Sequence, residues 1–469
     1  MLGERELSFT MVAKSMSRRR TGQQPRAWLN RLLWWEPFWV LGLAPSLLFT
    51  EYFWEPTLRP LLIVALFLFW PLRLKAEQPL LPRGAAGWFL GFLLLWLLVT
   101  IGRSANSNLS WEIAGYLYLA LVGFVALIHW PPLRKQPAGL ALLLMTVGVG
   151  LAVVGPEAFS VNPDKMLDAY QTEEFSLVDP TLEGETINPN ILGAALALIL
   201  PLGLALALHW SWARWRWLPL LLWAPILLMG NGLLLSQSRS SWLALGVAGL
   251  LLFWWLLTSS AITTAGSVRN RLRWRRILAL LVVVVLLAAL AFLWRAGAIN
   301  RWVTPELQQS TQTSLIRRME IWRLSLALVG NNPLTGIGLG NYEAAFTAAF
   351  PTLPLSQGRL APPHAHNLFL QLALDLGLPG LLAYVGFGAL LFSQLLRRLH
   401  QPPDGRQVLA HSAAAQSVAI GVSSALAAML LVGCFDNALW GTKLTVIPWS
   451  LFALALIVGE VEEPNASRS

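Results

Sequence analysis

Apolar stretches fill most of the chain and alternate with short polar connections. Many approach the length of about 20 residues with which an α-helix crosses a bilayer. We predict about twelve membrane-spanning helices, at residues 37–50, 58–71, 86–101, 111–130, 138–155, 189–209, 217–233, 241–257, 277–296, 366–396, 412–433 and 442–459. The first two are short, whereas 366–396 is long enough to continue a turn or two beyond the bilayer. The pattern is typical of an all-α, polytopic integral membrane protein.

Composition agrees with this fold class. The chain of 469 residues is 56% hydrophobic and 12% charged, whereas soluble domains carry about 25% charged residues. The net charge of +10 is spread over alternate connections, so the sequence does not indicate a nucleic-acid partner. A single cysteine, Cys434, excludes an internal disulfide and a cysteine-based metal centre.

Charge distribution predicts the orientation in the membrane. Arginine and lysine cluster in the N-terminal tail and in the connections after the second, fourth, sixth, eighth and tenth predicted spans. Such clusters mark cytoplasmic loops, and one of the opposite loops, 156–187, is acidic. We therefore expect both termini on the cytoplasmic side of the membrane. The polar, basic N-terminal segment has no apolar core, so no cleavable signal peptide is expected.

The predicted organisation has four parts. They are a basic cytoplasmic tail at 1–36, N-terminal transmembrane helices at 37–185, a second membrane domain at 186–459 and a cytoplasmic tail at 460–469. The second domain contains a predicted external loop, 297–365, which is far longer than the usual helix connection of about 2–8 residues.

Part of this loop is predicted to be helical. Within 313–330, apolar residues recur at helical spacing, namely Leu315, Met319, Trp322, Leu326 and Val329. We expect an amphipathic helix that lies against the outer face with this stripe inward and arginines beside it. The following GIGLGNY, 336–342, lacks the context of a dinucleotide-binding loop and predicts a tight turn at the membrane surface.

Two histidines mark the point where the long loop enters the next span. The stretch APPHAHNLFLQLALDLGLPGLLAYV, 361–385, places His364, His366 and Asn367 at the mouth of an apolar segment. A histidine at a boundary between water and membrane titrates near neutral pH and can accept a proton from a hydroxyl. A purely structural histidine, capping a helix or tolerating an interface, fits the pattern as well.

Three arginines lie on the predicted external side, against the general charge trend. Arg239 begins a span within SQSRSSW, and Arg317 and Arg318 lie on the predicted amphipathic helix. A guanidinium stays charged and matches the geometry of phosphate oxygens. Because no nucleotide pool exists on that side, the fitting substrate is a lipid phosphate or pyrophosphate. Alternatively, the arginines extend to lipid headgroups or pair with neighbouring glutamates.

Two further polar residues complete the candidate substrate-binding set, with Arg317, His364 and Asn367. Asp436 follows span 412–433 and could hydrogen-bond substrate or Arg239. Asn190 lies in the NPN that opens span 189–209, a pattern that also fits helix capping. The sequence has no signature of a metal site, and we expect neither a metal nor another cofactor.

Several segments together resemble the O-antigen ligase superfamily. SQSRSSWLAL, RRMEIWRLSLALVGNNPLTGIGLGNYEAAF and HAHNLFLQLALDLGLPGLLAYV resemble three blocks of that family, and INPNILGAAL and FDNALWG resemble its neighbouring segments. The resemblance covers about residues 186–445, and the blocks occur in the family's order. One departure is Asp375, where the family often has glutamate.

The resemblance implies a reaction and roles for particular residues. Members of the family move a glycan from an undecaprenyl-pyrophosphate carrier to a lipid or glycan acceptor hydroxyl outside the inner membrane, without a nucleotide or a required metal. By motif position, Arg239 and Arg318 would hold the pyrophosphate, and His366 would take the acceptor's proton. Arg317 and His364 are the alternates for these two roles.

Three other functions stay open at this stage. A polysaccharide polymerase of the same superfamily would differ only in its acceptor. The chain also resembles the cyanobacterial inorganic-carbon-accumulation branch, which implies transport of bicarbonate or another solute. The intact HAHN and the scarcity of ionisable residues deep within spans favour transferase chemistry over transport. A structural membrane partner without chemistry is the third alternative.

Overall fold

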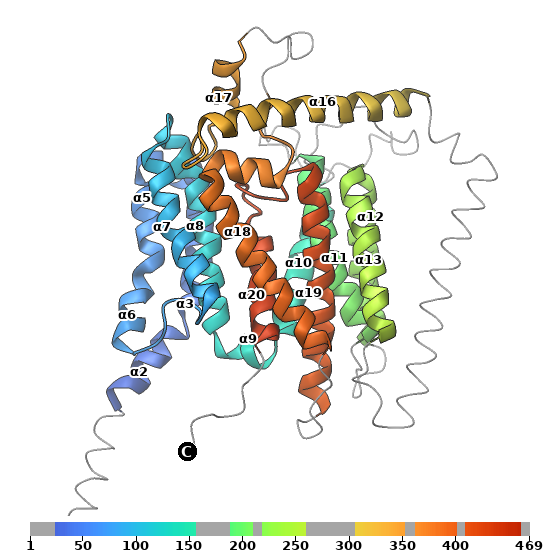
Figure 1. Ribbon diagram of the computed structural model, residues 1–469. Coiled ribbons are helices and arrows are strands. Elements are labelled where there is room, and N and C mark those ends of the chain that lie inside the picture. The colour runs from blue at the N-terminus through green and yellow to red at the C-terminus, as the bar shows by residue number, and fades with distance from the viewer. Residues whose placement is uncertain are drawn as a thin grey trace, which may run out of the picture.

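The computed structural model describes residues 24–155, 188–209, 218–258, 305–351, 362–400 and 409–460, which form helices and no strands. Most helices run side by side in a bundle, and α16 (Pro305–Asn331) lies across one end of it (Figure 1). We call this end of the bundle the α16 end.

The described residues of the N-terminal part of the chain form a series of short and long helices. They are α2 (Gln24–Leu33), α3 (Glu36–Leu48), α4 (Thr50–Phe53), η1 (Pro56–Leu58), α5 (Arg59–Leu66), η2 (Phe67–Phe69), α6 (Trp70–Lys75), α7 (Ala85–Gly102), α8 (Ser107–His129), α9 (Pro131–Lys135) and α10 (Ala138–Val154). The remaining helices besides α16 are α11 (Pro189–His209), α12 (Leu218–Leu235), α13 (Arg239–Thr258), α17 (Tyr342–Ala349), α18 (Leu368–His400), α19 (Leu409–Phe435) and α20 (Val446–Gly459).

The helices confirm the predicted class, and the exact number of spans stays a prediction. Within the described residues, seven helical segments are long and apolar enough to cross a membrane, and three shorter apolar helices accompany them. Each predicted span overlaps a helix except 277–296, which lies outside the described residues. The second predicted span is divided among α5, η2 and α6.

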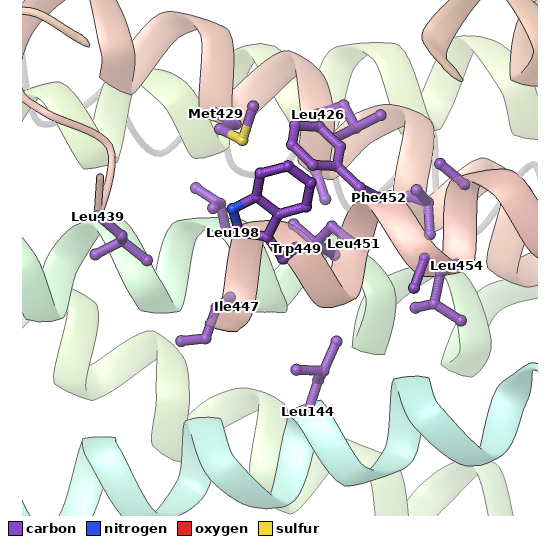
Figure 2. Packing of buried hydrophobic residues seen from close by; sticks show 14 of the residues in the cluster. Leu144, Leu198, Leu426, Met429, Leu439, Ile447, Trp449, Leu451, Phe452 and Leu454 are labelled. Atoms are coloured by element: carbon purple, nitrogen blue, oxygen red, sulfur yellow. The ribbon is translucent and has the colours of Figure 1, made fainter. Parts of the chain in front are cut away.

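The centre of the bundle is apolar and aromatic. Trp449 of α20 is only 1% exposed, and Leu198 and Met429 from two other helices surround it (Figure 2). Its ring centroid lies 5.8 Å from that of Phe124 in α8 and 5.7 Å from that of Phe387 in α18. Because buried aromatic pairs are stabilising contacts, this cluster ties α18 and α20 to the N-terminal half.

The long helix α18 is broken at Gly377. Its φ of +69° is in the left-handed region, which glycine adopts without the steric penalty of a side chain. The residues before the break lie across the α16 end, and those after it descend through the bundle (Figure 1). The predicted span 366–396 therefore overlaps a candidate membrane span, but it is interrupted at Gly377, a break that the sequence did not predict.

The break in α18 packs against the GIGLGNY turn. Gly336, Gly338 and Gly340 all have positive φ, which confirms the predicted tight turn. The Ile337 amide donates to the Leu374 carbonyl at 2.7 Å, and the Leu378 amide donates to the Pro333 carbonyl at 2.8 Å. These two bonds join the segment that follows α16 to α18 on either side of its break.

Gly377→Ala is expected to destabilise the protein by at least about 2 kcal/mol, because a left-handed residue with a side chain and a steric overlap each cost about 1–3 kcal/mol. A Cβ at this position would lie 2.0 Å from the Leu334 carbonyl oxygen. The control is Gly388→Ala on the same helix, where the nearest atoms are 3.9 Å away on Phe452. Thermal unfolding in detergent measures both, and equal melting temperatures for the two variants would contradict this account.

Candidate active site

Helix α16 carries the two candidate arginines over the α16 end. Its buried side chains are Ile321, Ser325 and Leu328, and the Ser325 hydroxyl hydrogen-bonds the Tyr342 hydroxyl of α17 at 2.8 Å. Arg317 and Arg318 are half-buried, one turn before this buried face. The helix therefore holds both guanidinium groups at the edge of its contact with the bundle.

The predicted inward stripe of α16 needs correction. Leu315, Met319 and Leu326 are exposed, and Trp322 and Val329 are only half-buried. The helix is rotated because α17 and the start of α18 cover the neighbouring face, where Tyr342 pairs with Ser325. Apolar spacing alone did not distinguish this face from the exposed one.

The segment before α18, here called the histidine loop (364–367), is fixed by hydrogen bonds to three helices, α16, α18 and α19. The Trp322 indole N–H of α16 donates to the His366 carbonyl at 3.2 Å. Asn367 accepts from the amides of Phe369 and Leu370, both at 3.0 Å, and so caps α18. Its amide nitrogen donates to the Cys434 carbonyl of α19 at 3.0 Å. Asn367 is thus used in holding the loop.

His366 has an unusual backbone and an unpaired ring nitrogen. Its φ is +49°, a left-handed conformation that costs a residue with a side chain about 1–2 kcal/mol. Its Nδ1 is buried and has no hydrogen-bond partner among the described residues. Since strained residues persist only where surrounding contacts hold them, the contacts of the histidine loop must hold the His366 backbone in this conformation.

His364 and Asp436 form a pair beside His366. His364 Nε2 lies 3.2 Å from Asp436 Oδ1, and the ring centroids of the two histidines are 4.2 Å apart. Asp436 also accepts from the Asn437 amide at 2.8 Å, while its Oδ2 is buried and has no partner in the part of the chain that the structure describes. The structure therefore brings together His364, His366 and Asp436.

Burial and the surrounding groups keep His366 neutral, and hydrogen bonding keeps Asp436 ionised. Burial is the main cause that lowers the pKa of His366 to about 4; His364, Arg318 and Arg317 act in the same direction, and Asp436 acts in the opposite one. Burial alone would raise the pKa of Asp436, but the hydrogen bond and charge of His364 hold it below its usual value. At neutral pH, His366 is therefore unprotonated, as a general base must be before it acts.

A second set of polar side chains lies under the histidine loop. Gln371 Oε1 accepts from the Ala365 amide at 2.9 Å, and Gln371 Nε2 donates to Asp375 Oδ1 at 3.0 Å. The other carboxylate oxygen, Asp375 Oδ2, accepts from the Trp440 indole at 2.9 Å. The sequence reasoning missed Gln371, although its spacing of four residues from Asp375 is the one at which helical Gln and Asp side chains meet.

Arg239 and Asn190 lie at the starts of two other helices. Arg239 is the first residue of α13, and Asn190 lies in the first turn of α11. Both helices pack against α19, which ends directly before Asp436. The Asn190 amide donates to the Asn188 side chain at 2.9 Å, which is the capping arrangement that the NPN predicts. A meeting of Arg239 with the histidines stays a prediction.

The cluster has residue types that metals bind, and charges of both signs surround it. One ligand atom from each of His364, His366 and Asp436 lies within 4.8 Å of the others, and two histidines with a carboxylate are a zinc-like set. Asp436 favours positive charge on the His366 ring, whereas Arg318 and Arg317 oppose it. The two arginines are the groups here that can attract an anionic ligand.

Comparison with known proteins identifies the segment that carries these residues. The family model described as O-antigen ligase matches residues 224–385, which confirms the resemblance to that superfamily. The match includes Arg239, both α16 arginines and the histidine loop, whereas Asn190 and Asp436 lie outside it. No curated protein matches the chain.

Proposed function

We propose that this chain, which contains an O-antigen ligase family segment, transfers a glycan from a lipid-pyrophosphate carrier to an acceptor hydroxyl. The family match over residues 224–385 supports a role in membrane glycan processing and polysaccharide biosynthesis, with lipid-linked glycan substrates. The observation that carries the finer proposal is geometric: α16, which bears Arg317 and Arg318, is bonded through the Trp322 indole to the carbonyl of His366, whose Nδ1 has no partner among the described residues. This arrangement supports a proton acceptor beside an anion site at the α16 end.

In this reaction, the arginines bind the pyrophosphate and His366 acts on the acceptor. Arg318 and Arg239, with Arg317 as the alternate, stabilise the negative charge of the undecaprenyl pyrophosphate as it leaves. The acceptor hydroxyl donates a hydrogen bond to the His366 ring, gives up its proton there and attacks the anomeric carbon. An in-line attack inverts that carbon. The α16 end faces the outside of the bacterial inner membrane, and both termini face the cytoplasm.

The pair of His364 and Asp436 supports His366 in this scheme. The Nε2 of His364 is engaged by the Asp436 carboxylate, whereas the Nδ1 of His366 is buried and has no partner among the described residues. We therefore assign the proton acceptance to His366 and the orientation of the neighbouring ring to Asp436. A hydrogen-bonded nitrogen positioned by a carboxylate can also shuttle a proton, so His364 is the alternate.

Transfer by the purified protein tests the proposal. The donor is an undecaprenyl-pyrophosphate-linked oligosaccharide, and two acceptors are offered separately: a lipid-linked core sugar and a second copy of the donor. Extension of the lipid acceptor identifies a ligase, whereas longer carrier-linked chains identify a polymerase. Absence of both products, together with solute uptake by proteoliposomes that survives loss of His366, would overturn the proposal in favour of transport.

The pH dependence of transfer is expected to differ between free and donor-bound protein. Because a general base must be unprotonated, kcat/KM for the donor is expected to fall only as the pH approaches about 4, the pKa of His366. Bound pyrophosphate offsets the arginine charges and so raises this pKa. The acidic limb of kcat is therefore expected at higher pH, because kcat reports the bound complex. If the acidic limbs of kcat and of kcat/KM fell at the same pH, this electrostatic coupling would be contradicted.

A further inference from the structure

The histidine loop and the segment with Asp436 rest on a common buried support. Gln371, Asp375 and Trp440 are each at most 5% exposed, and we call them the clamp. Gln371 bonds to the amide of Ala365, the residue between the two histidines. Trp440 belongs to the turn that begins with Asp436, and its amide donates to the Asn437 carbonyl at 2.9 Å. Asp375 thus links the two segments that carry the His364–Asp436 pair. It bonds Gln371, which holds the loop of His364, and Trp440, which lies in the turn of Asp436.

The hydrogen bonds of the clamp can be made in one direction only. A backbone N–H and an indole N–H donate but do not accept, so the Gln371 oxygen accepts from Ala365 and Asp375 Oδ2 accepts from Trp440. The Gln371 amide nitrogen therefore points to Asp375 Oδ1. An inverted Gln371 amide would set its nitrogen against the Ala365 N–H and its oxygen against the carboxylate.

We propose that Gln371 and Asp375 are positioning residues for glycan transfer, which set the place of the His366 ring and the His364–Asp436 contact. This inference rests on the proposed function. The clamp touches no reacting group, and it acts through the backbone of the histidine loop. Since displacement of a reacting group by about 1 Å can cost about 10²-fold in rate, its loss lowers kcat more than it weakens substrate binding.

A compensating pair of substitutions tests the direction of these bonds. In Gln371→Glu, two carboxylates face each other; in Asp375→Asn, the new amide sets a donor against either Gln371 or Trp440. The double variant Gln371→Glu/Asp375→Asn restores every partner: Glu accepts from Ala365 and from the Asn amide, and the Asn oxygen accepts from Trp440. The double variant also has the same number of carboxyl side chains at these two positions as the wild type. Ser393→Ala, which removes a bond to Leu390 at the far end of α18, is the control.

Each single variant is expected to lower kcat about 10- to 100-fold with less than about a twofold change in KM for the donor. The double variant is expected to regain at least about tenfold of the loss, and Ser393→Ala is expected to match the wild type. Single variants that match the wild type, or a double variant no faster than the slower single one, would overturn the proposal. So would an effect confined to KM.

A second measurement judges the clamp without glycan transfer. Diethyl pyrocarbonate modifies accessible histidines, and peptide mapping reports the rate at positions 364 and 366. Both single variants are expected to raise this rate, and the double variant is expected to restore the wild-type rate. Rates that are the same in all four proteins would overturn the clamp. A wild type that transfers no glycan but shows the expected labelling pattern would overturn the proposed function alone.

Discussion

Replacing His366 with alanine is expected to lower the rate of glycan transfer by about 10²–10⁴-fold, the usual contribution of a general base. The donor is held by the arginines, so its binding is expected to change little. The measurement is transfer in membranes with equal protein levels, beside competition binding of the lipid-pyrophosphate donor. His400→Ala is the matched control, because His400 is exposed at the opposite end of α18.

The outcome also separates the two histidines. If His366 is the base, His364→Ala is expected to be the milder variant, since it removes a neighbouring ring and leaves the acceptor nitrogen in place. A larger loss for His364→Ala than for His366→Ala would transfer the role of base to the His364–Asp436 pair. Transfer unchanged in both variants would remove general-base catalysis from the scheme.

Arg318→Ala is expected to reduce transfer by about 10²–10³-fold, as the loss of one charge-stabilising donor does in other enzymes. Unlike the histidine variant, it is also expected to weaken donor binding, because its charge acts on the bound pyrophosphate as well as on the leaving group. Arg323→Ala provides the control on the same helix, as Arg323 is exposed. Arg317→Ala compares the alternate position directly. Equal transfer by the Arg318 and Arg323 variants would remove Arg318 from the site.

The sequence predicts the general architecture well because its signals are local. Apolar length identifies membrane helices, and the spacing of residues within 313–330 predicts α16. The break at Gly377 was missed, because glycine is common in apolar helices and only the packing of Leu334 against it shows why its φ is positive. The inward face of α16 was misjudged because its buried contact includes a serine paired with Tyr342.

The site was predictable in its residue types and not in its pairings. His364 and His366 are neighbours in the chain, and the loop that presents them was recognised. Asp436 is 72 residues from His364, so no local pattern could reveal that it bonds this histidine. Asn367 was predicted to bind substrate, but its hydrogen bonds to α18 and α19 give it a structural use. A direct role toward substrate stays a prediction.

The central claim is that His366 and the α16 arginines act on one substrate in one step. It is tested most directly by single-turnover transfer with His366→Asn, Arg318→Lys and the double variant, where Arg318→Lys keeps the charge and a measurable rate. Groups that act on the same transition state are not independent. We therefore expect the double variant to lose clearly less than the product of the two single losses. Losses that multiply exactly would show two independent sites and contradict the account.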